Sequence, residues 1–185
     1  MSAPRPTTAT AHQLVTCLWF TGQAEEAARF YVEAFAGYRP DTHVGAVHRS
    51  NIDVAPQGET VLERGEVLTV DFTLDGQRFV ALNGSTEPVP YTDAVSFQVL
   101  CANQQEIDHF WTALTAGGGQ EVACGWVTDR YGVRWQVVPQ VLFELLAGED
   151  QDAAARVQSA MMGMTKFSIE GLMDAAKDAY GAEEE

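Results

Sequence analysis

The chain has 185 residues, of which 46% are hydrophobic, a length and composition that can fill the core of one sizeable domain. Its formal net charge of −15 makes nucleic acid and anionic membranes poor partners, because both require clustered lysine and arginine. The cysteines, Cys17, Cys101 and Cys124, are odd in number and lack the close spacing of a zinc site, which favours buried thiols over a disulfide framework.

We expect neither a signal peptide nor a membrane span in this sequence. The opening MSAPRPTTATA lacks the apolar run of a signal peptide, and no later window has the roughly 18 apolar residues of a membrane span. We therefore expect a cytoplasmic protein with a flexible N-terminus over residues 1–12.

The first half of the chain predicts the element order βαβββ. Residues 14–20 (LVTCLWF) are a short apolar run typical of a strand, and a helix follows with apolar residues at helical spacing. These are Ala24, Ala27, Ala28, Tyr31, Ala34 and Phe35. Residues 43–50 and 66–74 have the pattern of strands, and Asp75-Gly76 predicts the tight turn of a hairpin.

The second half repeats this order with a compressed middle. We predict a strand over 94–101, a helix over 103–116, and strands near 121–129 and 133–138. Aligning residues 15–37 with 95–117 pairs Val15 with Val95 and Phe30 with Phe110, and aligning 75–82 with 131–138 pairs Arg78 with Arg134. Two copies are too few for a solenoid, so the repeat predicts one domain built from two similar halves that share a core.

Helices are expected after Pro139. The pattern predicts helical segments over 141–148 and 151–164 and a third helix after Ser168, a plausible N-cap. Met161, Met162, Met164 and Phe167 form an adaptable apolar face suited to packing against the body or another subunit. The expected organisation is thus a first module over 13–93, a second over 94–139 and a helical tail over 140–185.

The segments CLWFTGQAEEAARFY, VSFQVLC and, above all, CGWVTDRYGVRWQVVP with its helical tail resemble the PhnB-like branch of the vicinal oxygen chelate superfamily. This superfamily holds glyoxalase, bleomycin-resistance proteins and extradiol dioxygenases, and the resemblance covers residues 13–165. It implies an α+β fold in which two βαβββ modules curl mixed sheets around a cavity, assembled as a homodimer. The branch often carries a demethylubiquinone methyltransferase-like label, but no glycine-rich motif of the kind a nucleotide-type cofactor needs follows a strand.

The resemblance also implies where a metal would be bound. Metal-using members hold a divalent ion with four His or Glu side chains, and those positions fall here on Thr16, Val80, Ser96 and Gln136. None of these residues offers an imidazole or a carboxylate, so we expect no metal and no cofactor. The four histidines do not change this expectation, since we interpret them as surface or structural: His12, His43, His48 and His109.

Strand alternation predicts which side chains line the cavity. If Thr16 and Ser96 point inward, then Leu18, Phe20, Gln98 and Leu100 do so too, and Cys17, Trp19, Phe97, Val99 and Cys101 lie against the helices. The same alternation places Gln136 inside the cavity and Trp135 in the core. In the strand 66–74, Asp71 lies on the face opposite the apolar residues.

The candidate site residues follow from this placement. We expect Thr16, Ser96, Gln98 and Gln136 to bind a ligand through hydroxyl or amide groups, and Trp126, near a turn at the cavity mouth, to stack on a planar ligand. Asp71 is the candidate catalytic residue, a general base if it lines the pocket and an ordinary surface aspartate if it does not. Asn83 either orients a ligand or satisfies buried backbone groups. Cys124 has no evident partner that would activate it as a nucleophile.

Two classes of function fit these residues. The first is a metal-free small-molecule binding protein of the bleomycin-resistance style, which sequesters a planar or amphipathic compound. The alternative is an enzyme of the same superfamily, a lyase, isomerase or dioxygenase, that uses Asp71 as base or an unrecognised metal site. A structural or regulatory dimer without a small ligand is the third hypothesis, since one scaffold in this superfamily hosts many functions.

Overall fold

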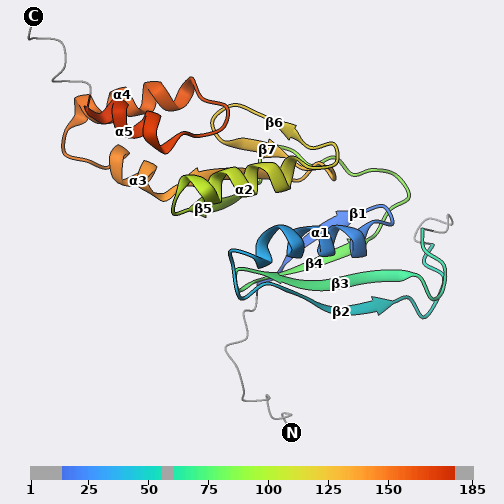
Figure 1. Ribbon diagram of the computed structural model, residues 1–185. Helices are drawn as coiled ribbons and strands as arrows, with labels where there is room; N and C mark the ends of the chain where they lie inside the picture. Colours follow the sequence, from blue (N-terminus) through green and yellow to red (C-terminus); the bar gives the residue numbers. More distant parts are fainter. Residues whose placement is uncertain (1–13, 56–60, 178–185) are drawn as a thin grey trace, which may run out of the picture. The chain divides into compact units, whose positions relative to one another are not determined.

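The computed structural model describes residues 14–55 and 61–177, so the expected flexible segment 1–12 lies outside the described residues. The chain divides into two compact units, residues 1–89 and 90–185 (Figure 1). Each unit contains one four-stranded sheet and is described by itself.

The first unit has the predicted order βαβββ. Its elements are β1 (Thr16–Phe20), α1 (Ala24–Ala36), β2 (His43–Arg49), β3 (Val67–Leu74) and β4 (Gln77–Asn83). The strand order in space is β1-β4-β3-β2, with β1 parallel to β4 and the other pairs antiparallel. The mixed sheet follows from the connections, because the β3–β4 hairpin is antiparallel and α1 lets β1 lie parallel to the last strand.

The core of this unit lies between α1 and one face of the sheet (Figure 1). Tyr31 of α1 stacks on Phe72 with ring centroids 5.9 Å apart, and Phe72 stacks on Phe79 at 5.1 Å. The six α1 residues predicted to be apolar at helical spacing are all buried. At the hairpin, Asp75 and Gly76 both have positive φ, 50° and 77°, which confirms the predicted tight turn.

The second unit repeats the topology with shorter strands. Its elements are β5 (Phe97–Cys101), α2 (Gln104–Thr115), β6 (Gln120–Glu121), β7 (Trp126–Thr128) and β8 (Arg134–Pro139). The order in space is β5-β8-β7-β6, with β5 parallel to β8, which matches the first sheet strand for strand. The α+β fold of two βαβββ modules is therefore confirmed, and the predicted strand near 121–129 is two short strands.

A buried aspartate holds the turn between β7 and β8. Asp129 is 3% exposed, and its Oδ1 accepts hydrogen bonds from the backbone N–H groups of Tyr131 (2.8 Å) and Val133 (3.0 Å). Its Oδ2 accepts one from the indole Nε1 of Trp135 at 2.8 Å. The DRYGVRW segment, which carries most of the family resemblance, thus forms a turn stabilised by its own hydrogen bonds, one of which holds Trp135 in the core.

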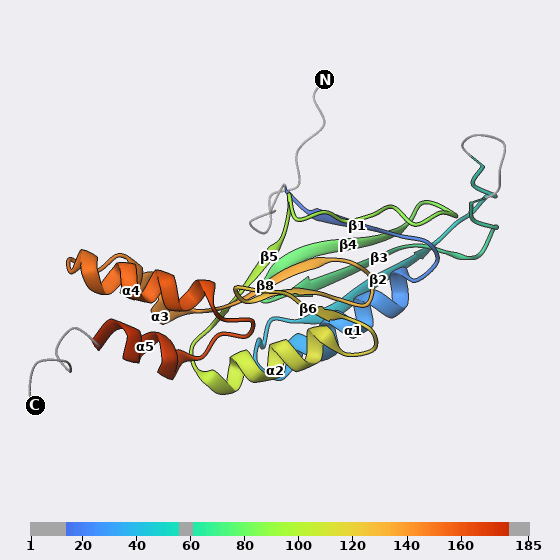
Figure 2. The ribbon, with the colours of Figure 1, turned by 90° about the horizontal axis from the view of Figure 1, so that it is seen from above.

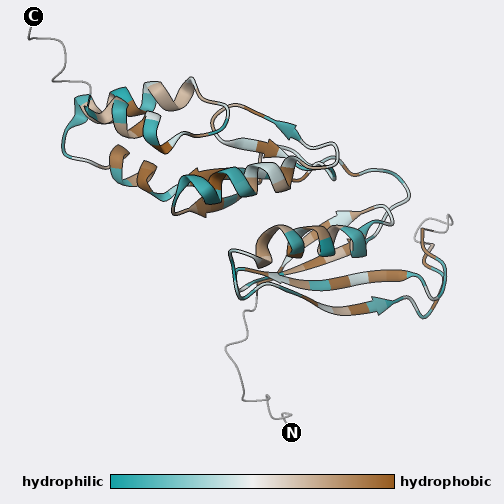
Figure 3. Ribbon diagram, viewed as in Figure 1, coloured by the Kyte–Doolittle hydropathy of each residue, from teal (hydrophilic) through white to brown (hydrophobic). Residues whose placement is uncertain are grey.

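The C-terminal tail forms three helices, α3 (Gln140–Leu146), α4 (Gln151–Met162) and α5 (Ile169–Lys177), gathered at one end of the second unit (Figure 2). Figure 3 shows α3 as the most apolar of them. Their apolar cluster includes Val138 of β8 and the buried tail residues Leu142, Val157, Phe167 and Leu172. The predicted N-cap is confirmed, because Ser168 Oγ accepts a hydrogen bond from the N–H of Gly171 at 3.1 Å.

Polar contacts fasten the tail to α2. The side chain of Gln104 donates to the carbonyl of Phe167 (3.1 Å) and accepts from the N–H of Ile169 (3.0 Å). Lys166 Nζ lies 2.5 Å from Asp108 Oδ1. A side chain at Gly125 would collide with the Phe167 ring, so this glycine permits the close approach. Among the helices that the structure describes, none is long and apolar enough to span a membrane.

Candidate functional site

In each unit one face of the sheet packs against a helix, α1 in the first unit and α2 in the second. We call the opposite face of each sheet its distal face. In the first sheet, Leu18 and Phe20 of β1 are buried on the α1 side, paired with Ala81 and Asn83 of β4. Thr16 lies on this same face, opposite Phe79. The distal face of the first sheet carries Cys17, Trp19, Asp71, Val80 and Leu82.

The predicted inward orientation of Thr16, Leu18 and Phe20 is therefore wrong, as is the placement of Cys17 and Trp19 against the helix. The cause is a loop-length difference between the halves. Three residues, 21–23, join β1 to α1, whereas two residues, 102–103, join β5 to α2. Aligning the helices therefore shifted the strands by one residue, and a shift of one residue exchanges the two faces of a strand.

In the second sheet the predicted faces are correct. Phe97, Val99 and Cys101 lie on the α2 side, with the Phe97 ring 5.2 Å from that of Trp135. The distal face of the second sheet carries Gln98 and Leu100 of β5, Trp126 of β7, and Arg134 and Gln136 of β8.

Three of the predicted ligand-binding residues form a hydrogen-bonded row on this distal face. Gln98 Nε2 donates to Gln136 Oε1 (3.2 Å), and Gln136 Nε2 donates to Ser96 Oγ (2.7 Å). Trp126 lies directly opposite Gln136 across the β7–β8 ladder. The structure thus brings together four of the predicted residues: Ser96, Gln98, Gln136 and Trp126. Thr16 is not among them, because it lies on the helix-covered face of the first sheet.

A cavity of about 210 Å³ opens beside Trp126. It is lined by Asp93, Val122, Trp126, Val127, Thr128 and Arg134. Sequence reasoning missed Arg134, although the alternation that placed Gln136 on the distal face also places the residue two positions earlier there. Its guanidinium contacts Asp93 Oδ1 through Nε at 2.9 Å and donates to Thr128 Oγ1 through Nη1.

Asp71 lies on the distal face of the first sheet, as predicted, with 36% of its side chain exposed. His48 Nε2 lies 3.6 Å from Asp71 Oδ2, within ion-pair range but too far for a hydrogen bond. We expected His48 to be a surface or structural histidine. It is indeed exposed, but it shares its face with the candidate base.

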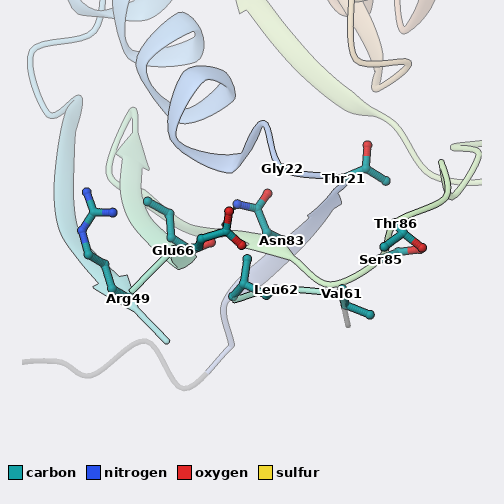
Figure 4. Close-up of a pocket in the computed structure, with 10 residues that line it drawn as sticks. Thr21, Gly22, Arg49, Val61, Leu62, Glu66, Asn83, Ser85 and Thr86 are labelled. Carbon is teal, nitrogen blue, oxygen red and sulfur yellow. Dashed lines mark hydrogen bonds between the residues drawn. The ribbon is translucent and has the colours of Figure 1, made fainter. Parts of the chain in front are cut away.

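The first unit has a wider and more polar cavity of about 460 Å³ (Figure 4). Figure 4 shows Asn83 near its centre, between Glu66 and Leu62. Asn83 Oδ1 accepts from the N–H of Ala24 at the start of α1 (3.0 Å), and its Nδ2 donates to the carbonyl of Val67 (2.9 Å). Of the two roles considered for Asn83, the contacts favour satisfying buried backbone.

Comparison with known proteins supports the resemblance seen in the sequence. The family model described as 3-demethylubiquinone-9 3-methyltransferase matches residues 12–138. The chain belongs to this PhnB-like family. No curated protein matches the chain.

Solved structures that are similar to the chain include the following two. A putative 3-demethylubiquinone-9 3-methyltransferase, PhnB protein, from Bacillus cereus is 27% identical, with a TM-score of 0.57, 69% of this chain covered and 99% of that chain covered. Protein PA1353 from Pseudomonas aeruginosa is 18% identical, with a TM-score of 0.52 and coverages of 70% and 98%. The family match ends at residue 138, before the tail helices begin at Gln140.

The metal that the superfamily implies does not fit this donor set. The inherited positions hold Thr16, Val80, Ser96 and Gln136, and the corrected β1 register matches Ser96 with Val15 in place of Thr16, which offers no metal-binding group either. Within residues 14–55 and 61–177, no three His, Cys, Asp or Glu side chains gather as a metal-binding group.

Cys124 is also poorly placed for catalysis. Its Sγ lies 3.8 Å from Met162 Sδ, and its backbone N–H donates to the carbonyl of Met164. These contacts join the β6–β7 turn to the tail, so the cysteine has a structural environment.

Proposed function

We propose that the protein is a metal-free small-molecule binding protein, which holds a planar or amphipathic compound on the distal face of the second sheet. The observation that carries this proposal is the row Gln98–Gln136–Ser96 beside Trp126. Small-molecule sites commonly combine apolar and aromatic surface with a few placed polar groups. The distal face of the second sheet offers the Trp126 ring and the polar row, next to the cavity of about 210 Å³.

The hydrogen-bonded row leaves groups for a ligand. Each glutamine amide has two N–H donors and an oxygen with two lone pairs, and the row uses one donor of each glutamine and one lone pair of Gln136. Because Gln98 Nε2 donates to Gln136 Oε1, the orientation of the Gln98 amide is fixed, and its Oε1 remains able to accept a hydrogen bond from a ligand. A planar ligand that stacks on Trp126 could therefore pair with an oriented Gln98 amide.

The test is replacement of either glutamine. Gln98→Leu and Gln136→Leu should each weaken binding of a planar amide probe, naphthalene-2-carboxamide, by about 1 to 3 kcal/mol, because a ligand polar group loses its partner. Isothermal titration calorimetry measures this loss. Gln105→Leu, on the exposed surface of α2, is the matched control and should leave affinity unchanged. Equal affinity in all three variants would contradict the proposal.

One observation favours a second candidate function, an enzyme that uses Asp71 as general base. His48 lies beside Asp71 on the distal face of the first sheet, and a carboxylate next to an imidazole is a common proton-transfer arrangement. Asp71→Asn separates the two candidates. In an enzyme, turnover nearly vanishes while the ligand still binds, whereas in a binding protein affinity shifts only modestly.

The name of the matched family suggests methyl transfer, but the strand-to-helix loops do not favour that activity. A nucleotide-type methyl donor is typically held by a glycine-rich turn after a strand. The two strand-to-helix loops are Thr21-Gly22-Gln23 and Ala102-Asn103, with Gly22 as their sole glycine. Neither loop is the glycine-rich turn that would hold such a cofactor.

We further propose that the protein acts as a cytoplasmic homodimer. Cys17, Cys101 and Cys124 are all free thiols, which suits a reducing compartment. The edges of the two sheets, β1 and β2 in the first and β5 and β6 in the second, leave backbone groups that a second chain can cover.

A further inference from the structure

The guanidinium of Arg134 lines the cavity beside Trp126 and has N–H donors that make no hydrogen bond with the described residues. A guanidinium has five N–H donors. Among the residues that the structure describes, Nη1 donates to Thr128 Oγ1, and Nε is buried near Asp93 without an aligned hydrogen bond. Nη2 therefore keeps both of its donors for a further partner.

We propose that this cavity takes a planar ligand that carries a carboxylate, with Arg134 pairing the carboxylate and Trp126 stacking on the ring. The inference rests on the proposed function, since it names the chemical class of ligand for the same face. The guanidinium fork matches the two oxygens of a carboxylate, and such charge-assisted pairs are stronger than neutral hydrogen bonds.

Arg134 places a partly buried positive charge at the cavity of a chain that is acidic overall. The chain as a whole has a net charge of −15, so its overall field does not attract anions. The Arg134 side chain is only 27% exposed, and reduced contact with water strengthens its interaction with an anion. Val122, Trp126 and Val127 supply the apolar wall for the rest of the ligand.

Asp93 already shows that a carboxylate fits against this guanidinium. Its Oδ1 lies 2.9 Å from Nε, yet 77% of the Asp93 side chain is exposed. Pairs with an exposed partner contribute little stability. A ligand carboxylate can therefore displace Asp93, which makes Asp93 a competitor for the ligand.

The experiment compares naphthalene-2-carboxylate with naphthalene-2-carboxamide, which differ in the charged group alone. By calorimetry, the full-length protein should bind the carboxylate at least about tenfold more tightly. Arg134→Gln should abolish this preference while carboxamide binding persists, and Arg134→Lys should keep part of it. Arg29→Gln, an exposed arginine on α1, is the matched control and should leave both affinities unchanged.

Asp93→Asn provides an independent arm. Removing the competing carboxylate should raise affinity for the naphthoate by about two- to fivefold without a change for the carboxamide. Equal binding of the two compounds to the unmodified protein, or an unchanged preference in Arg134→Gln, overturns this inference and leaves the proposed function standing. Binding of neither compound overturns both.

Discussion

Asp129 holds the turn that joins β7 to β8 in the second sheet. It accepts three hydrogen bonds in a buried position, from two backbone N–H groups and from the indole of Trp135. Asp129→Ala should lower the free energy of unfolding by at least about 2 kcal/mol, because three buried donors lose their acceptor. Urea unfolding followed by circular dichroism measures the change.

The control for this prediction is Asp174→Ala, since Asp174 is 60% exposed on α5 and should tolerate replacement. Asp129→Asn should give an intermediate loss, because one end of the amide still accepts while the other opposes a donor. An Asp129→Ala variant as stable as the Asp174→Ala variant would show that the turn does not need its carboxylate.

The residues of the site could be predicted from sequence only in part. Period-two alternation placed Gln98 and Gln136 correctly because the register of β5 and β8 was right. It failed for Thr16 because a loop longer by one residue shifts β1, and a weak repeat does not reveal such a shift. The pairing of His48 with Asp71 joins residues of different strands, and their distance depends on the ladder between β2 and β3.

At the scale of elements, patterns of apolar residues predicted nearly every helix and strand. The α1 face, the hairpin turn at Asp75-Gly76 and the three tail helices all follow from spacing and capping residues. The strands β6 and β7 were less predictable because they are only two and three residues long. Such short strands form few backbone hydrogen bonds, and side-chain contacts help to hold them. One example is the hydrogen bond that Trp111 Nε1 of α2 donates to Glu121 Oε1 of β6 (2.8 Å).

The docking of the tail on α2 should depend on pH through Asp108. Hydrogen bonds from Lys166 and then from Gln104 lower the pKa of Asp108 below its ordinary value. A lowered pKa in the folded state contributes stability above the unfolded value of 3.8, and this contribution is lost as the pH falls through the folded pKa. Because both partners are substantially exposed, the contribution stays below about 1 kcal/mol.

Lys166→Gln should therefore be slightly less stable than the unmodified protein at neutral pH, and the two should converge in acid. Thermal unfolding of both proteins across this range measures the difference. Lys177→Gln, whose ammonium lies 3.7 Å from Asp174 on the same short helix, is the matched control. A difference that persists unchanged below the pKa of Asp108, or that concentrated salt does not reduce, would rule out the ion pair as its origin.

At the scale of the whole molecule, the donor set predicts how the purified protein behaves towards metals. The positions inherited from metal-using relatives offer hydroxyl, alkyl and amide groups, which lack the charge and basicity that transition metals require. We expect no stoichiometric transition metal after purification without added ions, as measured by inductively coupled plasma mass spectrometry. One Ni, Zn, Mn or Fe per chain, removable by chelation with loss of stability, would instead support the lyase or dioxygenase alternative.

Exposed apolar side chains near the edge strands bear on how the chain assembles. Trp19 (40% exposed), Val95 (72%) and Leu100 (42%) are large apolar side chains left in contact with water near the edge strands β1 and β5. Burying such groups against a second chain is favourable by about 25 cal/mol for each Å² removed from water. Light scattering should therefore give twice the mass of one chain at micromolar concentration, and Trp19→Ser with Leu100→Ser should shift the equilibrium to monomers. Phe143→Ser, at an exposed residue of α3, is the control, and a single-chain mass for the unmodified protein would refute the dimer.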